Sequence, residues 1–121
     1  MKVSFALMLA SMYALAAAPA MAGQQFGTVN VLNVRDSDGL LWVNLTGSPS
    51  DRPLCAANTT YWIIPNETTD TGKRLYEMLL AANVAGRAIT IHGKNTCNRW
   101  GDGEDIDFIE MWDASATIAP R

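Results

Sequence analysis

The stretch TTYWIIPNETTDTGKRLYEMLLAANVAGRAITIH, residues 59–92, decides the fold, because it predicts a strand, a helix and another strand in succession. Residues 59–64 are rich in β-branched and aromatic side chains and stop at Pro65, which is typical of a strand. Residues 88–92, Ala-Ile-Thr-Ile-His, carry isoleucine at alternate positions and predict the strand that follows the helix. The predicted helix therefore has a strand before it and a strand after it in the sequence.

Helical periodicity covers the middle of this stretch. The apolar side chains recur at the spacing of one helix face, and they are Leu75, Met78, Leu79 and Ala82. We expect the helix to begin near Thr71 with Asp70 as its N-cap, and to end at Gly86, where glycine suits a left-handed residue.

Two more strands are expected upstream of this stretch. Residues 27–34 alternate between polar and apolar and change phase at Val31-Leu32, which indicates a twist or a β-bulge. Residues 36–39 form a turn with glycine at its end, and residues 40–45 resume as the second strand of a hairpin.

Downstream, residues 93–103 are expected to form a loop and residues 106–112 a fifth strand. In that strand Ile106, Phe108 and Trp112 should share one face, which places Ile109 and Met111 on the outer face. The order βββαββ is that of the OB-fold, a five-stranded, partly open Greek-key barrel with one helix, so the fold class is mainly β. An α+β layer protein could share this order.

The amino terminus resembles an export leader. An apolar run from about Phe5 to Ala18 follows Lys2 and ends in Ala20-Met21-Ala22, which predicts a signal peptide over residues 1–22. The run is too short for a membrane span. We expect one domain over residues 23–113, secreted or periplasmic, with a flexible tail at 114–121. In an oxidising compartment its two cysteines, Cys55 and Cys97, should form a disulfide.

The charge pattern argues against nucleic acid as a partner. Removing the leader leaves eight basic and twelve acidic residues, a net charge of −4, and the cations are scattered rather than gathered in a stripe.

Aromatic side chains provide the candidate binding site. Trp42, Trp62 and Trp112 fall within expected strands, where a core position is the ordinary explanation. Trp100 falls in the 93–103 loop, where it offers a flat face to a ligand or covers the disulfide as a hydrophobic lid. The candidate ligand-binding residues are Asn98, Arg99, Trp100 and Asp102.

The acidic segment from Asp102 to Asp113 carries the other chemical hypotheses. It lacks the ligand spacing of an EF-hand, so we expect its acids to be solvated loop residues and predict no metal site and no cofactor. One histidine and a disulfide leave no zinc site, and no nucleophile elbow occurs. A hydrolase that uses carboxylates of this segment is the alternative to a binding protein.

Short motifs resemble a toxin family. These are Gly27-Thr28-Val29, Leu54-Cys55-Ala56, Leu79-Leu80-Ala81-Ala82, Gly86-Arg87 and Cys97. They are similar to the receptor-binding B subunits of the subtilase-cytotoxin and pertussis-like AB5 toxins, and to small secreted bacterial proteins that share the pattern.

The resemblance spans about Gly27 to Trp112 and implies an OB-fold, a disulfide, ring assembly into pentamers and binding of host glycans, often sialylated. Those subunits extend further upstream of the glycine, so only the cysteines are carried over. We therefore expect a secreted, non-enzymatic binding module that recognises a carbohydrate or protein partner. Homo-oligomerisation through the outer face of the fifth strand is a further expectation.

Overall fold

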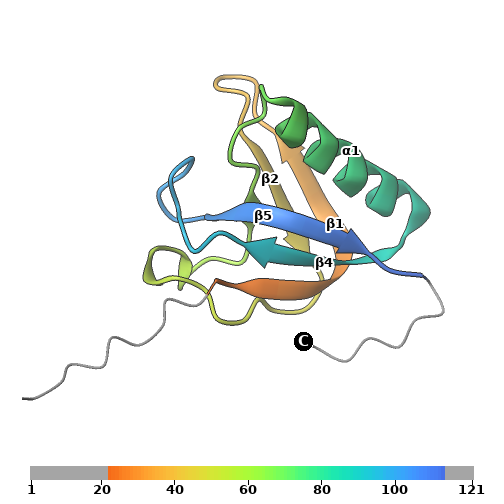
Figure 1. Cartoon of the computed structure of the whole chain (residues 1–121), viewed down its shortest axis with the longest axis horizontal. Coiled ribbons are helices and arrows are strands. Elements are labelled where there is room, and N and C mark those ends of the chain that lie inside the picture. The colour runs from red at the N-terminus through yellow and green to blue at the C-terminus, as the bar shows by residue number, and fades with distance from the viewer. Residues whose placement is uncertain (1–21, 114–121) are drawn as a thin grey trace, which may run out of the picture.

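The computed structural model describes residues 22–113, which form a closed barrel (Figure 1). Its strands are β1 (Gln24–Val34), β2 (Leu41–Leu45), β3 (Trp62–Ile63), β4 (Ala88–Gly93) and β5 (Glu104–Met111), in the spatial order β1-β2-β3-β5-β4. β3 and β5 run parallel, and the other neighbours are antiparallel. The mainly β class and the order βββαββ are confirmed, and closure of the sheet excludes the open-layer alternative.

β1 serves both halves of the barrel because it bends at a bulge. Residues 24–28 pair with β4, and residues 29–34 pair with β2 after a register shift between Val29 and Val31. The shift moves the inward-facing set from Gln25, Gly27 and Val29 to Leu32. This confirms the irregularity predicted from the phase change.

Helix α1 (Asp70–Ala85) lies along one side of the barrel and packs against β1 and β5 (Figure 1). Its N-cap is Thr69, whose hydroxyl accepts a hydrogen bond from Gly72 N at 3.0 Å, so the prediction of Asp70 was wrong by one residue. Asp is the more common N-cap by residue type, but the backbone leaves the helix at Thr69, whose φ and ψ are extended, so Asp70 falls inside the first turn. Gly86 ends the helix with φ +62°, as expected.

The core fills the barrel and the space under α1. It consists of Val29, Leu41, Val43, Leu45, Trp62, Ile64, Leu75, Leu79, Ala82, Ile89, Ile91, Ile106 and Ile109. The buried side chain of Gln25 accepts a hydrogen bond from Trp62 Nε1 at 2.8 Å, which satisfies the buried indole.

A bulge in β5 overturns the predicted faces of that strand. His92 lies opposite Phe108 and Gly93 opposite Ile106, so Asp107 is an extra residue. Ile106 and Ile109 therefore both point into the core, while Phe108 is 44% exposed. The prediction that Ile109 and Met111 form an outer apolar surface was wrong, because Ile109 is buried and Met111 packs against the core.

β3 is much shorter than the predicted strand 59–64. Arg52 replaces part of the missing strand pairing, since its guanidinium donates hydrogen bonds to the carbonyl oxygens of Thr59 and Tyr61. The same guanidinium lies over the Trp62 ring, 4.5 Å from the centroid. Side-chain hydrogen bonds, those of Arg52 among them, thus hold residues 59–61 where the sheet ladder is missing.

The disulfide joins Cys55, in the short 3₁₀ helix η1 (Leu54–Ala56), to Cys97 in the segment between β4 and β5. It confirms the predicted pairing. No helix within residues 22–113 is long and apolar enough to cross a membrane. The expected signal peptide, apart from Ala22, and the expected tail at 114–121 lie outside the described residues.

We expect the double substitution Cys55→Ser and Cys97→Ser to lower the free energy of unfolding by roughly 4 kcal/mol, because the bridge closes a long loop in the unfolded chain. Urea unfolding followed by tryptophan fluorescence measures the loss, and wild type in excess reductant should match the variant. A loss below about 1 kcal/mol would contradict a stabilising role.

Candidate functional site

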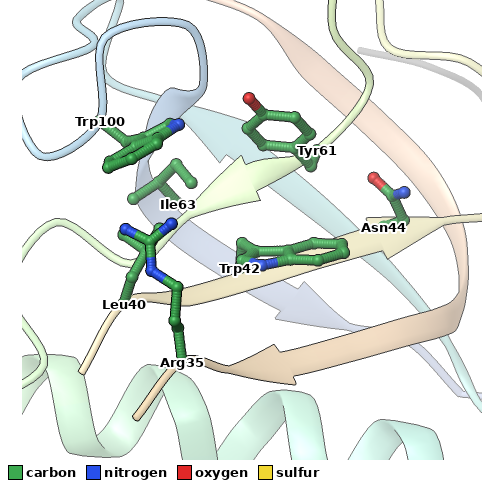
Figure 2. A pocket seen from close by; sticks show the side chains of 7 residues that line it. All are labelled: Arg35, Leu40, Trp42, Asn44, Tyr61, Ile63 and Trp100. Atoms are coloured by element: carbon green, nitrogen blue, oxygen red, sulfur yellow. The ribbon is translucent and has the colours of Figure 1, made fainter. Parts of the chain in front are cut away.

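An open pocket of about 280 Å³ lies on the outer surface of β2 and β3 (Figure 2). The β1–β2 loop (residues 35–40) borders it on one side, and the β4–β5 loop (residues 94–103) borders it on the other. Its lining residues are Arg35, Leu40, Trp42, Asn44, Tyr61, Ile63 and Trp100.

Three aromatic side chains form most of the pocket wall. Trp42 projects outward from β2, and its ring lies 5.8 Å from that of Tyr61 at an angle of 52°. Trp100 extends from the β4–β5 loop toward the same space and is 38% exposed (Figure 2). The pocket therefore presents aromatic surface from two strands and one loop.

The tryptophans thus divide between core and surface. Trp62 is fully buried, as predicted, but the core prediction was wrong for Trp42. In β2 the residues at even positions face outward, so Trp42 and Asn44 share the pocket side of the strand. Trp112 is also only partly buried, and its indole donates to Thr90 Oγ1 at 3.1 Å.

Arg35 fixes the position of Trp100. Its guanidinium carbon lies 4.3 Å from the centroid of the indole, a cation–π contact. The same guanidinium forms a two-pronged ion pair with Asp38, with Nε 2.9 Å from Oδ1. This pairing raises the pKa of Arg35 and holds the pKa of Asp38 well below its usual range. The positive charge of Arg35 in the pocket is therefore already neutralised by Asp38.

Buried Asp105 holds the β4–β5 loop from beneath. Its carboxylate accepts hydrogen bonds from Thr96 Oγ1 at 2.7 Å, from Asn98 N at 2.8 Å and from Arg99 N at 3.3 Å. The side chain is 1% exposed, so the prediction that this acid is solvated was wrong. A carboxylate with three donors is stable without water, and these donors fix the backbone that carries Trp100.

Glu104 is the second buried acid and is fully inaccessible to solvent. Its Oε2 accepts from Asn95 N and from Gly23 N, both at 3.0 Å. It joins the start of the β4–β5 loop to the segment that enters β1. The expectation of solvated acids was wrong here as well, because backbone amides from distant segments supply its donors.

The other predicted site residues support the loop rather than line the pocket. Arg99 pairs with Glu67, in the segment between β3 and α1, with Nη2 2.8 Å from Oε1, and also donates to Asp38 O at 2.9 Å. This pair lowers the pKa of Glu67. Asn98 is exposed and contributes its backbone N–H to Asp105. Their role in ligand binding stays a prediction.

Asp102 cross-links the loop to the strand side of the pocket. Its carboxylate accepts a hydrogen bond from the Tyr61 hydroxyl, and its carbonyl oxygen accepts a hydrogen bond from Thr59 Oγ1. Burial and this hydrogen bond raise the pKa of Tyr61 to about 12. The phenol therefore stays neutral and oriented at physiological pH.

Asn44 lines the pocket and carries a polar atom without a partner. Its Oδ1 is buried and accepts no hydrogen bond from any residue in the range 22–113. A buried acceptor without a donor is costly, and a donor on a bound molecule would satisfy it once rotation of the Asn44 side chain turns the oxygen toward the pocket. Alternation along residues 41–45 could have shown that Trp42 and Asn44 share a face, but Arg35 and Tyr61 join them only through the tertiary fold.

Metal chemistry finds no support in the described part of the chain. No group of three or more His, Cys, Asp or Glu side chains there could hold a metal ion. The acids of the 102–113 segment point to different partners, as Glu104 and Asp105 show.

We expect Tyr61 to titrate near pH 12 in the folded protein, since burial and Asp102 favour the neutral phenol. Because the folded pKa is raised, the stability that it contributes is present below its ordinary value of about 10 and is lost as the pH rises toward 12. Ultraviolet absorbance after rapid pH jumps, compared between wild type and Tyr61→Phe, measures this pKa. Asp102→Asn should lower it, and a value near 10 in wild type would contradict the hydrogen bond.

Comparison with known proteins yields no assignment: no family model, curated protein or solved structure matches this chain. The likeness to toxin B subunits, beyond an OB-fold-like barrel, therefore stays a prediction.

Proposed function

We propose that this chain is a secreted, non-enzymatic carbohydrate-binding protein and that the pocket lined by Trp42, Asn44, Tyr61 and Trp100 is its sugar site. The observation that carries the proposal is the combination of three aromatic side chains and an unsatisfied amide oxygen around one open pocket.

Sugar rings match this chemistry in two ways. Their C–H groups pack on the face of an indole, while their hydroxyls donate to acceptors such as Asn44 Oδ1. The pocket volume, about 280 Å³, suits one or two rings rather than a long chain. The face of strands 2 and 3, flanked by the loops between strands 1 and 2 and between 4 and 5, is also where OB-folds bind oligosaccharides.

The charge balance favours an uncharged sugar. Arg35 is the cation that lines the pocket, and Asp38 already occupies its guanidinium. An acidic sugar would have to compete with that carboxylate and would also approach Asp102, which accepts from Tyr61 at the rim. We therefore propose a neutral glycan rather than the sialylated one that the toxin resemblance implies.

The hydrolase alternative has less support, because two acids of its segment are engaged. Glu104 and Asp105 are buried and accept hydrogen bonds from the backbone and from Thr96, and neither lines the pocket. A catalytic carboxylate must reach the substrate.

The finer resemblance to toxin B subunits is kept as a proposal. A closed five-stranded barrel with one helix and a disulfide agrees with it. Ring assembly remains part of that proposal, but Ile109 and Met111 cannot form its contact, since the one is buried and the other packs on the core.

A glycan array probed with the purified protein tests this function. We expect binding to neutral glycans, weakened roughly 10- to 100-fold by Trp100→Ala or Asn44→Ala, which corresponds to about 1.4–2.8 kcal/mol. Phe108→Ala is the matched control, because Phe108 is a similarly exposed aromatic on β5 and does not line the pocket.

Equal binding by wild type and both pocket variants would remove the site assignment. Absence of binding to any glycan would favour a protein partner instead. Preference for sialylated over neutral glycans would contradict the charge argument.

A further inference from the structure

Glu104 has hydrogen-bonding capacity that the described residues do not use. The side chain is fully buried, and its Oε1 has no hydrogen-bond partner within residues 22–113. A buried, half-satisfied carboxylate is expensive, since desolvation of a charge is offset only when its oxygens are paired and hydrogen-bonded. Oε1 can therefore accept a hydrogen bond from a further donor.

Arg52 satisfies this need only in part. Its Nε lies 3.8 Å from Glu104 Oε1, too far for a hydrogen bond, and the Nε itself has no partner among the described residues. The two outer nitrogens of Arg52 are committed to the carbonyl oxygens of Thr59 and Tyr61. Arg52 therefore supplies charge nearby without a donor to Oε1.

The carboxylate sits directly against the backbone of two glycines. A Cβ on Gly93 would stand 1.8 Å from Oε2, and a Cβ on Gly23 would stand 2.4 Å from Oε1. Gly23 is buried, its N–H already donates to Oε2 at 3.0 Å, and its carbonyl accepts from Gly93 N at 2.8 Å. The backbone of residue 23 therefore lies close to both carboxylate oxygens of Glu104.

We infer that the Glu104 carboxylate is the binding site for the chain's own processed amino terminus. The triplet Ala20-Met21-Ala22 directs leader cleavage after Ala22, which would make Gly23 the first residue. Cleavage turns the Gly23 amide, one N–H donor, into an ammonium with three donors and a positive charge. That ammonium pairs with Glu104 and supplies the donor that Oε1 lacks.

The contact with Glu104 therefore depends on the position at which the leader is cleaved. A terminus one residue longer would keep an amide at Gly23 and leave its charge outside, because Ala22 is exposed. A chain beginning at any residue with a Cβ in place of Gly23 would meet Glu104 Oε1. Only cleavage before Gly23 places the ammonium charge next to Glu104 on a residue that has no Cβ to clash with the carboxylate.

The pH dependence of this pair has a defined sign. An α-amino group titrates near 7.7–8.0 in an unfolded chain, and pairing with a buried carboxylate raises that value. The stability that it contributes is therefore complete below about pH 7.7 and is lost as the pH rises through the folded value. Glu104 on β5 faces the amine and raises its pKa, whereas Arg52, a second cation beside the same carboxylate, acts in the opposite direction, so the inference requires the attraction of Glu104 to be the larger. Asp51 and Lys94 on the flanking segments are exposed.

The experiment compares two exported full-length chains, wild type and a variant with one alanine inserted between Ala22 and Gly23. Mass spectrometry of the purified proteins first identifies each amino terminus. We expect wild type to begin at Gly23 and the variant to begin one alanine earlier, with a Tm lower by roughly 5 °C or more at pH 7. The difference should disappear by about pH 10, where both amines are neutral.

A second measurement does not depend on stability. Acylation of the α-amine by an amine-reactive ester at pH 7 should be at least about tenfold slower in wild type than in the insertion variant, because a paired ammonium cannot act as a nucleophile. Glu104→Gln in both chains, where they fold, should abolish both differences.

A wild-type terminus at any residue other than Gly23 would overturn the inference. Equal Tm values at pH 7, or equal acylation rates, would overturn it as well. Both results would show that the charge of the terminus lies outside the Glu104 site.

Discussion

The rest of the structure depends on two buried carboxylates that open β5. Glu104 and Asp105 are adjacent in sequence and point to opposite sides of the strand, as successive residues in a sheet do. Glu104 contacts the segment that enters β1, the start of the β4–β5 loop and Arg52. Asp105 accepts hydrogen bonds from the β4–β5 loop. Burying two charges is costly unless donors surround them, so this end of the barrel is stable only when all of these segments are in place together.

Both carboxylates also control the pocket, although neither lines it. Asp105 fixes the loop that presents Trp100, and Glu104 lies beside Arg52, which holds the carbonyl oxygen of Tyr61. Asp102 then ties the Tyr61 hydroxyl to the loop. The two aromatic walls are thus positioned from the core outward, before any ligand arrives. A preorganised site loses little side-chain entropy on binding, which suits the weak individual contacts that sugar rings make.

The regular part of this architecture could be predicted from sequence, because periodicity reports which face of an element is buried. The strand order, the helix with Gly86 at its end, the irregularity in β1 and the disulfide all follow from local patterns. The errors concern properties set by partners distant in sequence. The bulge at Asp107 changes which residues of β5 face the core. The burial of Glu104 and Asp105 depends on donors from other segments, namely Gly23, Thr96 and Asn98, which no local pattern reveals. Trp42 appeared to be a core residue because hydrophobicity does not distinguish the two faces of a strand whose outer side is a pocket.

Trp100 lines the pocket, but most of its sequence neighbours do not. Its loop position and polar neighbours singled it out, yet those neighbours turn toward structural partners: Arg99 toward Glu67, and Asp102 toward Tyr61. The groups that complete its surroundings come instead from the β1–β2 loop and from the outward face of β2, some sixty residues earlier. Arg35 lies over the Trp100 ring while Asp38 holds the guanidinium from behind, so the cation orients the indole without presenting free charge to the pocket. The same contact that fixes the aromatic face is therefore also the basis of the proposed preference for an uncharged ligand, and we expect the two properties to change together if Asp38 is removed.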